Sequence, residues 1–130
     1  MTKVLHTEQA PAAIGPYVQG VDLGNMVMTS GQIPVIPATG EIVSDDVAKQ
    51  ARQSLDNVKA VIESSGLTVS DIVKMTVFVK DLGDFGTVNE VYGNFFDENG
   101  VANYPARSCV EVARLPKDVK IEIEAIAVRK

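Results

Sequence analysis

The chain has 130 residues, of which 45% are hydrophobic, and its formal net charge is -5. This length predicts a single domain spanning residues 1–130, and this apolar content excludes a disordered chain. The negative charge disfavours a phosphate backbone as partner, and no apolar run approaches the roughly 18 residues of a membrane helix, so we expect neither a nucleic acid nor a membrane partner.

The chain contains one cysteine, Cys109, so a disulfide within the chain is impossible. A lone thiol is typical of a reducing compartment. The first residues carry no long apolar run of the kind that a signal peptide needs. We therefore expect a cytoplasmic protein.

The N-terminal third predicts a hairpin between two irregular segments. A short strand is expected at residues 3–5, and the Ala-, Gly- and Pro-rich segment 9–16 is expected to be irregular. Residues 17–21 and 26–29 are β-prone and flank a Gly-Asn turn, which predicts a hairpin. Prolines and a glycine within 34–40 then indicate a loop.

The remaining chain alternates between helical and extended patterns. Apolar residues recur every three or four positions over 46–65 and again over 85–95, which predicts two helices. Segment 71–79 is β-branched and almost wholly apolar, as in a central strand, and 106–112 and 119–128 predict two more strands. The order ββ-α-β-α-ββ implies an α+β fold, with a single mixed β-sheet and two helices packed on one face.

Two of the predicted strands carry more apolar residues than a half-solvated sheet needs. Segments 26–29 and 71–79 are apolar at successive positions, so we expect both of their faces to be buried. Two helices cover one face only, and no residues remain to cover the other. We predict that another copy of the chain covers it, in an obligate homo-oligomer.

The strongest candidate site lies in strand 106–112, directly after Pro105. Alternate side chains share a face, so Arg107 and Cys109 are expected to point one way and Ser108 the other. A guanidinium at a strand start could hold a carboxylate through two parallel hydrogen bonds, and it could lower the pKa of a neighbouring thiol. From spacing alone, a solvated or ion-paired arginine and a buried cysteine are the more common outcomes.

The last predicted strand supplies a candidate acid. Glu122 and Glu124 alternate with apolar residues and therefore share one face. Antiparallel pairing of this strand with 106–112 would bring one of them beside Arg107 and Cys109. Spacing does not fix which glutamate this is, and both could instead line a solvated face or pair with the arginine.

Five sequence motifs point to one known family. They are Pro-Ala-Arg-Ser-Cys-Val at 105–110, Arg-Leu-Pro at 114–116, Ile-Glu-Ile at 121–123, Ile-Gly-Pro-Tyr at 14–17 and Thr-Ser-Gly-Gln-Ile-Pro at 29–34. Together they resemble the signature of the RidA family, the reactive intermediate deaminases, and the resemblance spans essentially the whole chain.

The resemblance implies a chorismate-mutase-like homotrimer with clefts between its subunits. It also implies hydrolysis of small 2-imino acids to 2-oxo acids and ammonia, with no cofactor and no metal. By position, Arg107 is implied to hold the substrate carboxylate and Glu122 to position and activate water, with Glu124 as the fallback. Tyr17 is implied to be a cleft residue with a catalytic role. Cys109 is implied to line the cleft as a further candidate catalytic residue. The remaining residues implied to bind the substrate are Ser30, Gly31, Asn89 and Ser108.

Three other functions remain open on sequence grounds. The chain could be a non-catalytic oligomer that binds 2-oxo acids, an endoribonuclease that inhibits translation, or a holdase chaperone. Ammonia release from imines would separate an enzyme from a binding protein, and steeply salt-sensitive RNA binding would support the ribonuclease. The single histidine, His6, and the single cysteine make a zinc site improbable.

Overall fold

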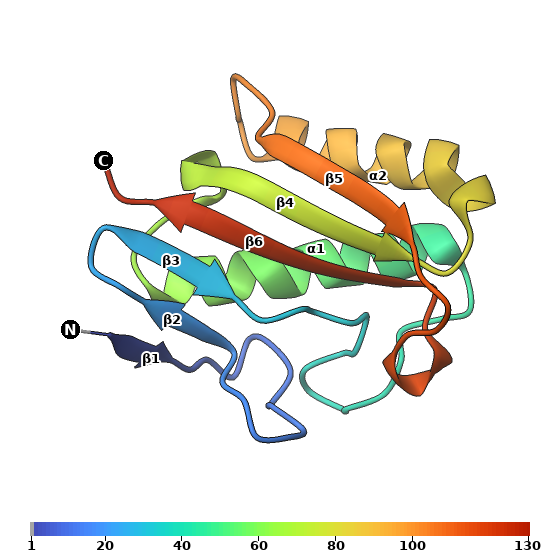
Figure 1. Ribbon diagram of the computed structural model, residues 1–130, viewed down its shortest axis with the longest axis horizontal. Helices are drawn as coiled ribbons and strands as arrows, with labels where there is room; N and C mark the ends of the chain where they lie inside the picture. Colours follow the sequence, from blue (N-terminus) through green and yellow to red (C-terminus); the bar gives the residue numbers. More distant parts are fainter. Residues whose placement is uncertain (1) are drawn as a thin grey trace.

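In the computed structural model, which describes residues 2–130, the chain forms one six-stranded sheet with two helices behind it (Figure 1). The segments with alternating apolar residues are strands, and the segments with helical spacing are helices. The strands are β1 (Lys3–Leu5), β2 (Gly20–Asp22), β3 (Met26–Thr29), β4 (Ile72–Val79), β5 (Ala106–Glu111) and β6 (Ile121–Val128), and the helices are α1 (Val47–Ser64) and α2 (Phe85–Glu98). The predicted α+β class, the mixed sheet and the short first strand are confirmed. No helix among residues 2–130 is long and apolar enough to cross a membrane.

The strand order is β1-β2-β3-β6-β4-β5. All neighbours are antiparallel except β4 and β5, which run parallel because the α2 crossover returns the chain in its original direction. The expected antiparallel pairing of the last two strands is therefore wrong. Strand β6 lies between β3 and β4, and β5 occupies the edge of the sheet.

The core fills the space between the sheet and the helices. Every second residue of β6, and of β4 from Met75 onward, points to this side and is buried. Helix α1 begins at the cap Asp46, whose carboxylate accepts a hydrogen bond from the Lys49 amide at 3.0 Å. Gly66 follows α1 with a φ of +89°, a conformation that glycine adopts without strain. The largest fully buried side chains of this core are Leu55, Ile62, Met75, Phe95, Phe96, Ile121 and Ile123.

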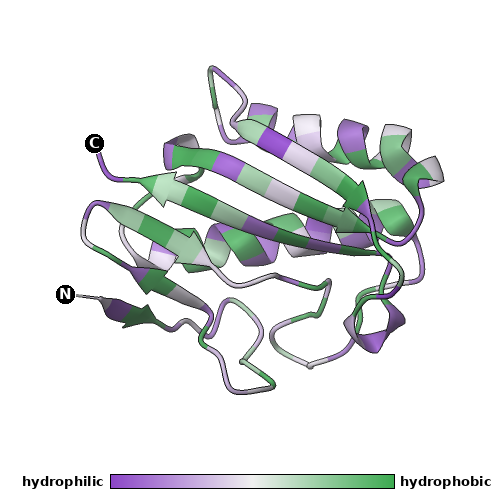
Figure 2. Cartoon of the chain, viewed as in Figure 1, coloured by the Kyte–Doolittle hydropathy of each residue, from purple (hydrophilic) through white to green (hydrophobic). Residues whose placement is uncertain are grey.

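No helix formed by residues 2–130 lies over the other face of the sheet (Figure 1). Met28 and Val110 are 40% and 44% exposed on this face, and Phe78 and Ile126 are half-buried. Burial along β3 and β4 alternates in the single chain, and the predicted burial of their second face by another copy of the chain stays a prediction. Figure 2 shows hydrophobic residues interspersed with polar ones along the strands of the sheet.

Candidate active site

Arg107 lies on the edge strand β5, opposite Met75 of β4 in the register, and therefore points to the helix side of the sheet. Its guanidinium carbon lies 4.8 Å from the ring centre of Tyr92 and 5.4 Å from that of Phe85. The guanidinium makes no ion pair with any of residues 2–130. Two aromatic contacts thus hold the group while its hydrogen-bond donors stay available.

The aromatic contacts come from one face of α2. Tyr92 is 6% exposed, and its buried hydroxyl has no hydrogen-bond partner among the described residues. Burial raises the pKa of Tyr92 to about 12, although the nearby Arg107 acts in the opposite direction. Asn89 is partly buried and lies one helical turn from both Phe85 and Tyr92, so it shares the helix face that meets the arginine.

Cys109 follows Arg107 on the same side of β5 and packs against the core. Burial raises the pKa of its thiol, and the positive charge of Arg107 only partly offsets this effect. The prediction of a lowered cysteine pKa is therefore wrong, because desolvation of the thiolate outweighs attraction to the cation. Ser108 points to the open face, as predicted, and its hydroxyl accepts a hydrogen bond of 3.0 Å from the Lys74 ammonium.

A second group of predicted residues lines a hollow of about 420 Å³ at the other side of the sheet. Glu122 and Glu124 are partly buried in its wall. The pKa of Glu122 is raised, first by burial and then by the like charge of Glu124. The residues that line this hollow are Ile14, Tyr17, Ser30, Gly31, Ile33, Pro116, Glu122 and Glu124.

The loop after β3 fits closely against Glu122. A Cβ atom at Gly31 would lie 2.8 Å from Cδ of Glu122 and closer still to Oε2, so any larger residue here would require the Glu122 carboxylate to move. The Ser30 hydroxyl donates to the Val18 carbonyl at 2.6 Å, which fixes the loop. Tyr17 is 46% exposed, and its hydroxyl accepts a hydrogen bond from the Ile14 amide at 3.2 Å.

The two groups of residues do not meet within one chain. Glu122 is opposite Phe78 in the register, whereas Arg107 is opposite Met75. Neighbouring positions in a strand alternate between faces, so Phe78 and Met75, three residues apart, point to opposite sides. The prediction that strand pairing brings a glutamate beside Arg107 and Cys109 is wrong, because β4 separates β5 from β6.

Comparisons with known proteins agree with the motif resemblance. The family described as endoribonuclease L-PSP matches residues 7–129. The chain is 74% identical over 130 residues to the 2-iminobutanoate/2-iminopropanoate deaminase of Escherichia coli K12, and the match covers 100% of both chains. The chain belongs to the RidA family. A crystal structure of Escherichia coli TdcF with bound serine is 68% identical, with a TM-score of 0.96 and coverage of 98% of this chain and 99% of that one.

In this RidA chain, sequence reasoning did not assign Phe85 and Tyr92 to the site. Both belong to the recurring apolar pattern that predicts the helix over 85–95, and that pattern alone does not point to a site. The signal that could have found them is their seven-residue separation, which puts two rings on one helix face with Asn89 between them. Residues 2–130 contain no group of three or more His, Cys, Asp or Glu side chains placed to hold a metal ion.

Proposed function

We propose that this protein hydrolyses small 2-imino acids to 2-oxo acids and ammonia, in clefts that two copies of the chain form together. The observation that carries the proposal is the guanidinium of Arg107, which two aromatic rings contact and which pairs with no carboxylate among residues 2–130. A planar guanidinium matches a carboxylate in two parallel hydrogen bonds. The name of the Escherichia coli relative supports the same substrate class.

Glu122 is the proposed general base. Burial and the like charge of Glu124 raise the pKa of Glu122, which makes its carboxylate a better proton acceptor than that of an exposed glutamate. The absence of a side chain at Gly31 leaves the space that this carboxylate occupies. A base within hydrogen-bond reach of water contributes roughly 100- to 10,000-fold to such a reaction.

The reaction balances without any further reactant. Water adds its oxygen to the imine carbon while Glu122 takes one of its protons, and the imine nitrogen, protonated from solvent, receives the electron pair of the C=N bond. Glu122 returns its proton to that nitrogen, the C–N bond breaks, ammonia leaves, and the hydroxyl loses its proton as it becomes the carbonyl. Tyr17 and Asn89 are proposed to border the cleft and Cys109 to line it as a neutral thiol, a poorer nucleophile than a thiolate.

The proposed assembly is a chorismate-mutase-like homotrimer. The open face of the sheet carries Met28 and Val110, which are substantially exposed in the single chain. Burial of such a face against another copy is favourable at about 25 cal/mol per Å². Arg107 on the edge strand of one copy can then approach Glu122 on the open face of the next. This arrangement joins the two groups that one chain holds apart.

Mixed assemblies test the proposal. Arg107→Ala and Glu122→Gln are each expected to lose nearly all ammonia release from imines generated in situ, while both remain folded oligomers. Co-refolding the two inactive proteins in equal amounts is expected to restore about a quarter of native activity, because about one site in four then receives both native residues. Full activity of Arg107→Ala alone, or no recovery in any mixture of folded proteins, contradicts the proposal.

The alternatives give different results in the same samples. A non-catalytic oligomer would bind a 2-oxo acid through Arg107 without accelerating ammonia release. The family description names an endoribonuclease, and RNA cleavage with steep salt dependence would support that activity. The net charge of -5 counts against it.

A further inference from the structure

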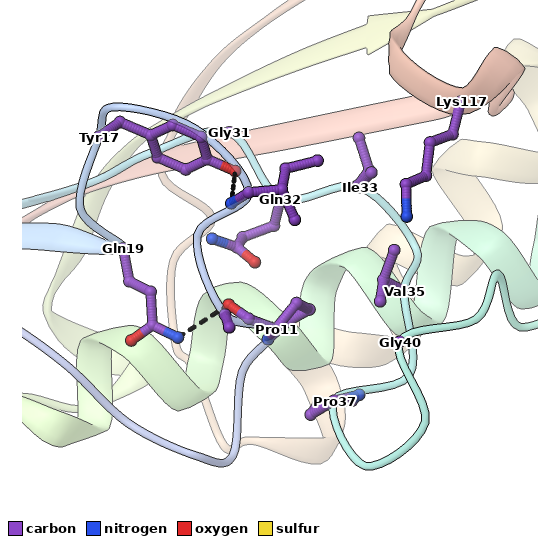
Figure 3. A pocket seen from close by; sticks show the side chains of 12 residues that line it. Pro11, Tyr17, Gln19, Gly31, Gln32, Ile33, Val35, Pro37, Gly40 and Lys117 are labelled. Atoms are coloured by element: carbon purple, nitrogen blue, oxygen red, sulfur yellow. Dashed lines mark hydrogen bonds between the residues drawn. The ribbon is translucent and has the colours of Figure 1, made fainter.

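A second, more enclosed cavity lies beside the Glu122 hollow and takes no part in the proposed reaction. It has a volume of about 170 Å³ and lies between the irregular lead-in before β2 and the loop after β3 (Figure 3). Its walls are mainly apolar, and Ile14, Tyr17, Gly31 and Ile33 border both spaces. The residues that line this cavity alone are Pro11, Ala12, Gln19, Gln32, Val35, Pro37, Gly40 and Lys117.

Two buried glutamines of this cavity differ sharply in their hydrogen bonding. Gln19 is 3% exposed, and its amide bonds the backbone of Thr7, Ala10 and Pro11, so it is a structural residue that fixes the lead-in. Gln32 is 5% exposed, and its side-chain amide takes part in none of the side-chain hydrogen bonds found among residues 2–130. The fully buried side-chain polar atoms that lack a partner among residues 2–130 do not include this amide, so its atoms can be reached from the cavity by water or by a ligand.

The Gln32 amide is directed into the cavity. In Figure 3 it lies between Tyr17 and Pro11, which line the cavity together with Gln32. The backbone of Gln32 is separately held by two hydrogen bonds to Ile123, of 2.7 and 3.1 Å, so the fold does not require this amide. Its two donors and its carbonyl oxygen are therefore available to a molecule in the cavity.

Lys117 adds a positive charge at the rim. Its backbone has a φ of 56°, in the left-handed region that a lysine rarely adopts, and its side chain makes no ion pair within residues 2–130. Figure 3 shows its ammonium end directed toward Val35. The apolar walls, the unpaired amide and this cation together define a site for an organic anion.

We infer that this cavity is a second ligand site, which binds a compact carboxylic acid with an apolar body of about six to eight carbon atoms. An apolar cavity of about 150 Å³ is known to accommodate benzene, so about 170 Å³ admits a ring of that size. The carboxylate pairs with Lys117, and Gln32 donates a hydrogen bond to one of the ligand oxygens. This inference is independent of the deaminase proposal, since it uses neither Arg107 nor Glu122.

Methyl-labelled protein and cyclohexanecarboxylate test the inference by nuclear magnetic resonance. We expect nuclear Overhauser contacts from the ring protons to the methyl groups of Val35, which lines this cavity and not the Glu122 hollow. Binding is expected to weaken about tenfold in Gln32→Leu and in Lys117→Gln, because each loses one hydrogen-bonding partner of the acid. Cyclohexanecarboxamide, of the same shape but uncharged, is expected to bind about tenfold more weakly than the acid.

The matched control is Arg107→Ala, which removes the carboxylate anchor of the reaction site and should leave contacts to Val35 intact. The inference is overturned if no contact to Val35 forms up to about 10 mM acid, which would leave only water in the cavity. It is also overturned if binding disappears in Arg107→Ala but persists in Gln32→Leu, or if the carboxamide binds as well as the acid. None of these results bears on ammonia release, so the two proposals can fail separately.

Discussion

Gly31→Ala is expected to inactivate the protein by displacing one carboxylate. The new Cβ would lie 2.8 Å from Cδ of Glu122, against 3.4 Å for an ordinary contact, and nearer still to Oε2. Cδ must therefore retreat by about 0.6 Å and the oxygen by more than about 1 Å. Displacement of a catalytic group by about 1 Å costs on the order of 100-fold in rate, or about 2.7 kcal/mol of transition-state stabilisation.

The assay is kcat/KM for ammonia release from imines generated in situ. Gly86→Ala is the matched control, since a Cβ there meets nothing within 4 Å and its activity should stay native. In a Glu122→Gln background the carboxylate base is already absent, so Gly31→Ala should add little further loss. The reasoning is refuted if Gly31→Ala retains activity within about threefold of native, or if the losses of the two substitutions simply multiply.

Three further predictions follow from the described contacts. Glu124→Gln removes a like charge that raises the pKa of Glu122, so the acidic limb of the kcat/KM profile should move to lower pH, and an unmoved limb would argue that another group is the base. Cys109→Ala should keep activity within about tenfold of native, because the thiol is not expected to act as a nucleophile. Thermal melts should show a free energy of unfolding about 1–2 kcal/mol lower, because the thiol packs against the core. Complete inactivity of the folded variant would indicate a covalent thiol step. Val110→Glu places a charge on the open sheet face, so its sedimentation coefficient should fall toward that of the single chain. Leu23→Glu is the control, because Leu23 is similarly exposed but lies in a turn, and its assembly should not change. An unchanged assembly in Val110→Glu would place the interface elsewhere.

Local patterns were sufficient to predict most of the secondary structure. The helix predicted over 46–65 is α1, because spacing of three to four residues and the cap Asp46 act within a few turns of chain. The motif around Arg107 and the Ile-Glu-Ile motif were likewise visible in sequence order. The helix and the two motifs depend on residues that are close together along the chain, so the sequence alone is enough to identify them.

Strand pairing and burial were decided only by the tertiary structure. Whether β6 lies beside β5 or beside β4 depends on contacts between distant segments, and this choice puts Arg107 and Glu122 on opposite faces. Burial, which raises the pKa of Cys109 although a cation is near, depends on the packed core around it. The position of the Gln32 amide in a cavity also depends on how distant segments pack. Sequence spacing shows which residues of one element share a face, but it does not show which faces of different elements meet.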